Sequence, residues 1–190
     1  GEFSVKKKNL SVHLFIVCLF AFILFPQMSF AQGTDFKWLL KYSGKSTNDV
    51  AWDKRFNNFL LAETPKISLD LGMGKPYLLK STVKEFIGGP PEDVSITNNE
   101  IIILSACRAH SCPEKAWLWC NIKTGVVVGA VIHYIFRGKY SENPSLLLFS
   151  NQVMSDYVPS QCQKDLENWL NKNKIVPAVR RFVDKKGKIT

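Results

Sequence analysis

Residues 101–112 read Ile101-Ile102-Ile103-Leu104-Ser105-Ala106-Cys107-Arg108-Ala109-His110-Ser111-Cys112. The apolar run that opens this stretch is typical of a buried strand. A disulfide between Cys107 and Cys112 would end that strand in a small covalent ring, with His110 at its tip. Because a closed ring preorganises a loop for binding, the stretch predicts a projection shaped to enter another molecule.

The N-terminus bears on whether this bridge can form. A basic cluster at 6–8 precedes a nearly uncharged apolar stretch over 10–25, and small residues stand where a signal peptidase would cleave after Ala31. We interpret residues 1–31 as a three-residue cloning remnant followed by a secretory signal peptide. The chain is then expected to be periplasmic, with no stable membrane insertion after cleavage. A retained membrane helix is the alternative.

Residues 32–190 have a length suited to a single domain with its own core. They hold four of the five cysteines, an even number in an oxidising compartment. We expect two disulfides, Cys107 with Cys112 and Cys120 with Cys162. Buried free thiols are the alternative.

The formal charge of the chain is +9, and removing the leader's three lysines and Glu2 lowers it to +7. A basic balance of this size suits contact with anionic cell-wall or membrane surfaces. The lysines and arginines are scattered, however, whereas nucleic-acid binding calls for a basic stripe with interleaved aromatic residues. We therefore expect no nucleic-acid partner.

Hydrophobic periodicity predicts an α+β fold, in which helices flank an antiparallel sheet of about five strands. Residues 35–61 have a helical pattern with a break at 43–48. A second helix is predicted over 160–171, with Cys162, Leu166, Trp169 and Leu170 on one face, followed by a polar tail. Because Cys162 lies on the apolar face of this helix, it points inward, where it could meet Cys120 on the predicted strand. This is the reason for expecting the second disulfide. Strands are predicted at 77–87, 100–106, 115–121, 126–136 and 145–151.

Two chemical roles for the ring are weaker than a binding role. Catalysis by a Cys/His pair needs a thiolate, which an oxidised cysteine lacks, and His133 falls inside a predicted strand, where we expect a packed or a surface residue without a catalytic role. The sequence holds no hydrolase, metalloprotease or phosphate-loop motif, so we expect no enzyme, no catalytic residue and no cofactor. Zinc held by Cys107, His110, Cys112 and Cys120 is disfavoured by the ligand spacing and by export, so we expect no metal.

The ring and its flanks resemble the Ivy family, periplasmic inhibitors of vertebrate (c-type) lysozyme. In that family a Ser-Ala-Cys lead-in and a Cys-x-x-His-x-Cys loop follow a strand, with a basic residue after the first Cys. Cys107, Arg108, His110 and Cys112 match this pattern position by position. Typical inhibitors carry Lys-Pro-His-Asp inside the ring, where this chain has Arg-Ala-His-Ser. The resemblance covers about 51–134.

The resemblance implies a protein inhibitor that inserts its His loop into the active-site cleft of a lysozyme or another muramidase. The residues implied to contact the target are His110, Arg108, Ala109 and Ser111. Such lysozymes place two carboxylates around the scissile bond, and an imidazole on a stiff ring could donate hydrogen bonds to both.

Two other functions stay open at this point. A charge of +7 would slow association with a strongly basic vertebrate lysozyme, which leaves open a less basic muramidase, a lytic enzyme of the producer's own wall or a competitor's toxin as the target. The alternative within the same binding class is an immunity protein directed against a wall-degrading effector. A function of another class is a peptidoglycan-binding module, in which Trp117 and Trp119 would stack on sugars; core packing is the alternative for both. A homodimer is also left open.

Overall fold

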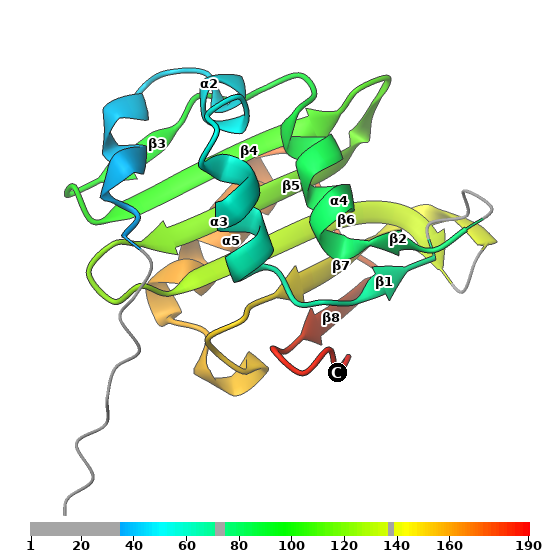
Figure 1. The fold of residues 1–190 in the computed structure, drawn as a ribbon. Helices are drawn as coiled ribbons and strands as arrows, with labels where there is room; N and C mark the ends of the chain where they lie inside the picture. Colours follow the sequence, from blue (N-terminus) through cyan, green and yellow to red (C-terminus); the bar gives the residue numbers. More distant parts are fainter. Residues whose placement is uncertain (1–34, 71–74, 137–138) are drawn as a thin grey trace, which may run out of the picture. The chain divides into compact units, whose positions relative to one another are not determined.

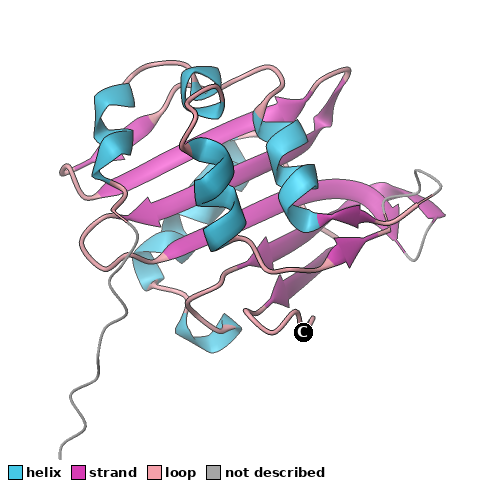
Figure 2. Cartoon of the chain, viewed as in Figure 1, coloured by secondary structure: helices cyan, strands magenta, loops and turns pink. Residues whose placement is uncertain are grey.

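Six strands form one sheet in the order β3-β4-β5-β6-β7-β8 in the computed structural model of the chain, which describes residues 35–70, 75–136 and 139–190 (Figures 1 and 2). Neighbouring strands are antiparallel except for the parallel pair β7–β8. The predicted α+β class is confirmed, with six strands in the sheet instead of about five. The strands are β3 (Ser95–Thr97), β4 (Ile101–Arg108), β5 (Ser111–Asn121), β6 (Val127–Phe136), β7 (Lys139–Phe149) and β8 (Val179–Val183).

Both faces of the sheet are buried, so the fold has three layers. One face is covered by α2 (Thr47–Ala51), α3 (Phe56–Glu63) and α4 (Leu79–Ile87), and the other by α5 (Ser160–Lys172) (Figure 1). Successive residues of a strand point to opposite faces, and β5 shows the consequence. Leu118 and Cys120 belong to the core under α2–α4, whereas Trp117 and Trp119 belong to the core under α5. We call these the front core and the α5 core.

Short helices open the described chain, as the periodicity predicts. They are η1 (Lys37–Tyr42), α2 (Thr47–Ala51) and α3 (Phe56–Glu63). A break at 43–46 falls within the predicted break over 43–48. Ser46 ends it by capping α2, because its hydroxyl oxygen accepts a hydrogen bond from the Asn48 backbone N–H at 3.1 Å. A second interruption at 52–55, which was not predicted, separates α2 from α3. Phe56, Phe59 and Leu60 anchor α3 in the front core.

The predicted strand over 77–87 is wrong. Only β2 (Tyr77–Leu78) is extended, and it pairs with β1 (Ser68–Leu69) outside the main sheet. The remainder is helix α4 (Leu79–Ile87). Its β-branched and aromatic residues favoured a strand, but its buried positions recur at intervals of three and four, which is the helical period. Those buried positions are Leu79, Thr82, Val83, Phe86 and Ile87.

The C-terminal helix is confirmed as α5 (Ser160–Lys172), which follows the short helix η2 (Ser155–Tyr157). All four residues predicted for its inner face are buried. Strand β8 was not predicted. The expected polar tail folds back on it, since Phe182 and Thr190 exchange two backbone hydrogen bonds of 2.9 Å.

The leader predicted over 1–31 lies outside the described residues. The described residues fall within one compact unit, 33–190. None of the helices in the described ranges is long and apolar enough to span a membrane.

Candidate functional site

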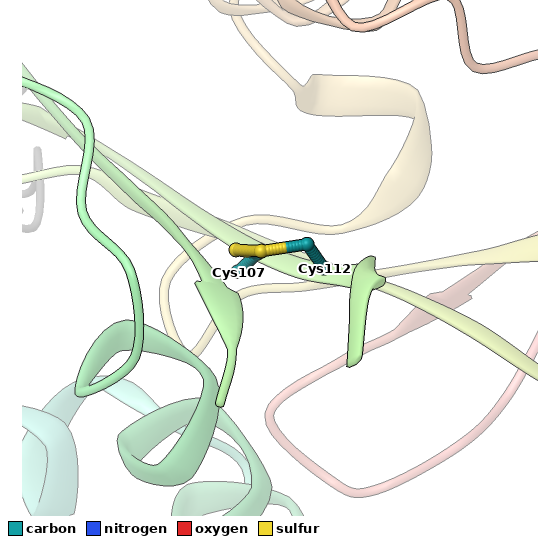
Figure 3. The surroundings of a disulfide bond; sticks show 2 residues. All are labelled: Cys107 and Cys112. Atoms are coloured by element: carbon teal, nitrogen blue, oxygen red, sulfur yellow. A yellow bond between two sulfur atoms is a disulfide. The ribbon is translucent and has the colours of Figure 1, made fainter. Parts of the chain in front are cut away.

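The disulfide-closed ring is the tip of the hairpin formed by β4 and β5. Cys107 and Cys112 are bonded, as predicted, with their Cα atoms 4.7 Å apart, and the bond ties the two strands together (Figure 3). Arg108 pairs with Ser111 across the hairpin, so Ala109 and His110 alone make the turn. The sheet thus carries a two-residue loop that is held by backbone pairing and by a covalent bond.

His110 is the second of the two residues in this turn. Its backbone adopts φ of +63°, in the left-handed region, which a non-glycine residue seldom enters. Its side chain is exposed, and so is Ala109, while Ser111 is half-buried. Within the described part of the chain His110 makes no hydrogen bond or ion pair, so its two ring nitrogens are available to another molecule.

Arg108, which the resemblance implies to contact a target, forms ion pairs within the protein itself. Its guanidinium donates to Glu85 of α4 at 2.7 Å and to Glu114 of β5 at 2.8 Å. It also lies over the Phe86 ring, 5.8 Å from the ring centroid. The hydrogen bonds to Glu114 and Glu85 raise the pKa of Arg108 above its ordinary value. Arg108 therefore fastens the ring to α4, with 24% of its side chain exposed.

The Gly88-Gly89-Pro90-Pro91 turn, which directly follows α4, also supports the ring. A Cβ atom on Gly89 would come within 2.0 Å of the Cys107 carbonyl oxygen and 2.6 Å of the Ala109 nitrogen. The Cys107 N–H donates to the Pro90 carbonyl oxygen at 3.0 Å. Asn48 can donate from its amide to the Gly89 carbonyl oxygen at 3.0 Å, which links this turn to α2. Backbone contacts thus brace the strand that leads into the ring.

A cleft of about 300 Å³ borders the ring on the side of β6 and β7. Besides Arg108 and Ser111, its lining includes Glu114 and two tyrosines, Tyr134 and Tyr140, whose rings stack with centroids 6.3 Å apart. Tyr140 is 75% exposed. Tyr134 is half-buried, so Tyr140 is the exposed ring of the pair. An exposed aromatic side chain beside a projecting loop is a feature that recurs in protein interfaces.

Sequence reasoning missed the residues that surround the ring. Glu85, Gly89, Glu114, Tyr134 and Tyr140 come from four separate segments, and only the fold brings them together. One local signal was present. The double glycine followed by prolines could have indicated a close backbone approach, whereas nothing in the sequence indicates the partners of Arg108.

The second predicted disulfide is wrong: Cys120 and Cys162 are free thiols. Cys120 points into the front core and Cys162 into the α5 core, so the sheet lies between them. The alternation that turns Trp119 toward α5 turns Cys120 away from it. Burial raises the pKa of both thiols, which keeps them protonated and unreactive.

The disulfide and the burial of His133 are relevant to two other roles for the ring, zinc binding and Cys/His catalysis. Zinc binding by Cys107 and Cys112 requires thiolates, and the disulfide consumes both. His133 is buried in β6, and burial lowers its pKa. Its Nδ1 accepts a hydrogen bond from the Ile135 N–H at 3.3 Å.

Trp117 and Trp119 are core residues, 0% and 1% exposed, so neither offers a face on which a sugar could stack from solvent.

Comparisons with protein-family models, with curated proteins and with solved structures found no match for this chain.

Proposed function

We propose that this protein is an exported inhibitor that inserts its disulfide-closed ring into the active-site cleft of a lysozyme or another muramidase. The observation that carries the proposal is the exposed, unengaged His110 at the tip of a two-residue turn that a disulfide closes. The resemblance of residues 103–112 to the inhibitor family adds support, because it places a histidine at this same position of the ring.

The proposed contact follows from the chemistry of both partners. A retaining muramidase places two carboxyl groups about 5–5.5 Å apart around the scissile bond. An imidazole ring with both nitrogens protonated presents two donors in opposed directions. Hydrogen bonds from such a ring to carboxylates are charge-assisted and are stronger than those between neutral groups. His110 would occupy the space of a substrate sugar, and inhibition would be competitive.

The contacts that hold the ring in place affect binding affinity more than they affect the stability of the fold. Each side chain or loop that must be ordered on binding costs about 0.5–1.5 kcal/mol. The disulfide, the Gly89 contact and the Arg108 ion pairs order the turn before any partner arrives. A preorganised tip can be small and still bind tightly, because little conformational entropy is lost on binding.

The charge around the ring bears on the choice of target. The net charge predicted for residues 32–190 is +7, yet Arg108 is compensated by two carboxylates at the site itself. The local surface therefore repels a basic lysozyme less than the net charge suggests, since exposed charges beyond about 10 Å are largely screened at 0.1 M salt. The vertebrate enzyme stays the first target to test, and a wall-degrading effector is the second.

The test is an inhibition assay with residues 32–190 against a panel of muramidases that differ in net charge. We expect inhibition that is competitive with an oligosaccharide substrate and that weakens roughly thirtyfold when His110 is replaced. Matched controls replace exposed residues away from the ring, such as Tyr157 and Val176. Absence of inhibition across the panel, or inhibition that the His110 variants leave unchanged, contradicts the proposal.

A further inference from the structure

A cavity of about 430 Å³ lies at the end of the sheet opposite the ring, between the segment that follows β7 and the turn that follows β8. These two strands run parallel, and their last residues, Phe149 and Val183, pair with each other (Figure 1). Phe149 also pairs with Gly129 near the start of β6, whereas Tyr134 near the end of β6 borders the ring. The cavity is therefore remote from the proposed inhibitory site.

One wall of this cavity exposes large apolar side chains. Met154 and Tyr157 are 57% and 73% exposed, and they lie three residues apart at η2. Gln152 fixes this wall to the body of the protein, since its amide donates to Glu63 of α3 and accepts a hydrogen bond from the Val127 N–H at 3.3 Å. Neighbouring apolar side chains exposed to this degree are a feature of surfaces that meet a membrane or another protein.

The facing wall is a turn that presents two lysines. Asp184 holds the turn together, because its Oδ1 accepts hydrogen bonds from the backbone N–H groups of Lys186 and Lys188 at 2.8 and 3.0 Å. The side chains of Lys185 and Lys186 line the cavity and are exposed, and neither Nζ has a hydrogen bond or ion pair among the described residues. Both ammonium groups are therefore available to an anion.

The charges around the cavity leave a positive balance. Of the described residues that line it, two are lysines and one, Asp184, carries a carboxylate. Lys188 of the same turn is exposed as well, and η2 carries one exposed carboxylate, Asp156. Three lysines thus stand against two carboxylates. A surface of this kind attracts an anion, and the apolar wall beside the lysines favours an anion that also offers an apolar phase.

We propose that this end of the protein docks on an anionic phospholipid membrane, through a membrane face made of Met154, Tyr157, Lys185 and Lys186. Lysines close to an anionic bilayer are attracted to the lipid phosphates, and a tyrosine suits the boundary between headgroups and acyl chains because its ring is apolar and its hydroxyl is polar. The cavity lies within the roughly 300–1,000 Å³ of sites for small ligands, which suits one lipid headgroup. The ring, at the opposite end, stays exposed.

The experiment is cosedimentation of residues 32–190, which contain the compact unit, with phospholipid vesicles at low ionic strength. One set of vesicles is phosphatidylcholine alone, and the other has one part phosphatidylglycerol to two parts phosphatidylcholine. We expect at least tenfold stronger binding to the anionic vesicles, and a loss of binding as salt is added, because salt screens the lysines. No binding to the anionic vesicles, or equal binding to both sets, overturns the proposal.

A pair of double variants tests whether the charge effect is local. Lys185→Gln with Lys186→Gln should weaken binding to the anionic vesicles about thirtyfold, the effect of two lysines near the membrane surface. Lys37→Gln with Lys54→Gln is the matched control, because it removes two exposed charges that do not line the cavity. The control should weaken binding less than threefold. Equal losses in the two double variants would mean that net charge alone causes the binding, and would overturn the proposed face.

A second pair of variants tests the apolar contact. Tyr157→Ser should weaken vesicle binding about tenfold, because the ring no longer enters the bilayer. Tyr140→Ser is the matched control, since Tyr140 is 75% exposed but lies beside the ring, and it should leave vesicle binding unchanged. Unchanged vesicle binding in Tyr157→Ser overturns the proposal. Inhibition of a soluble muramidase should be unaffected by Tyr157→Ser, so failure of membrane docking leaves the proposed inhibition standing.

An acidic protein is the other partner that exposed lysines fit. A titration with a polyglutamate peptide should show binding at least tenfold weaker than binding to the anionic vesicles, because the peptide offers no apolar layer to Met154 and Tyr157. Equal affinity for the peptide and the vesicles would assign this face to an acidic protein and would overturn the membrane proposal.

Discussion

Gly89 lies against the backbone of Cys107 so closely that a Cβ atom on Gly89 would come within 2.0 Å of the Cys107 carbonyl oxygen. No rotamer change can relieve such a contact, because both partners are backbone. The turn at 88–91 and the start of the ring at Cys107 are therefore packed together as one rigid unit. The shape of the ring depends on a glycine that lies 18 residues upstream of Cys107.

We expect Gly89→Ala to displace the ring. Overpacking of this kind costs about 1–3 kcal/mol, which in a domain of this size lowers Tm by about 2–4 °C per kcal/mol. Inhibition should fall as well, because the turn loses its support. Thermal melting and inhibition constants measure the two effects. Gly88→Ala is the matched control, since its Cβ would meet no atom closer than 3.2 Å. Equal behaviour of the two variants would contradict the bracing role of Gly89.

Replacing His110 should abolish most of the affinity without unfolding the protein. Loss of a central anchor typically costs about 2 kcal/mol or more, roughly thirtyfold in affinity. His110→Gly is a cleaner test than His110→Ala, because glycine adopts the φ of +63° without strain and preserves the turn. Both variants should lose affinity equally, with His110→Gly the more stable. Unchanged inhibition constants would place the binding surface elsewhere.

We expect Arg108→Ala to act on stability as well as on binding, because it leaves Glu85 and Glu114 without their shared guanidinium. These ion pairs are partly exposed, so they should contribute about 1–2 kcal/mol to the free energy of unfolding, less than a fully buried pair would. A double-mutant cycle of Arg108→Ala and Glu114→Ala, measured by urea denaturation, should give a coupling energy above about 0.5 kcal/mol. Strictly additive effects would mean that the ion pair contributes nothing.

Removing the ring disulfide should impair binding more than stability. A loop this short stabilises the fold by about 2 kcal/mol at most in the chain-entropy model. Cys107→Ser combined with Cys112→Ser should therefore leave a folded protein whose turn is mobile and whose inhibition is weak. Circular dichroism melts and inhibition assays separate the two. A collapse of Tm with undiminished binding by the folded fraction would identify the disulfide as a structural staple.

Cys120 and Cys162 should behave as inert thiols. Burial raises the pKa of each, so a thiol reagent at pH 8 should label neither in the native state and both after unfolding. Peptide mapping without reduction should show Cys107 joined to Cys112 and no other bridge. Detection of a Cys120–Cys162 disulfide would require the sheet to rearrange, because the two side chains lie on opposite faces of it.

Helix α4 illustrates how much of the secondary structure a local sequence pattern can predict. The segment 77–87 contains strand-favouring residues, and only its spacing of buried positions indicates a helix. In the folded protein the residues at that spacing pack together against the front face of the sheet, which stabilises the helix. Propensity is a weak preference, and burial against β4 and β5 overrides it.

The sequence by itself determined the features that depend on neighbours a few residues apart. These are the ring disulfide, the central strands with their alternating faces and the inner face of α5, all of which are confirmed. Covalent reach and residue periodicity act within one element, so a linear pattern is enough to specify them.

Only the tertiary structure decided which elements face each other. It placed α5 on the face opposite Cys120, brought Glu85 and Glu114 to Arg108, and set Gly89 against the ring. These relationships follow from the order of the strands and from the side of the sheet on which each connection passes. Both are settled by packing the whole chain at once, because a helix with one apolar stripe can be buried equally well on either face.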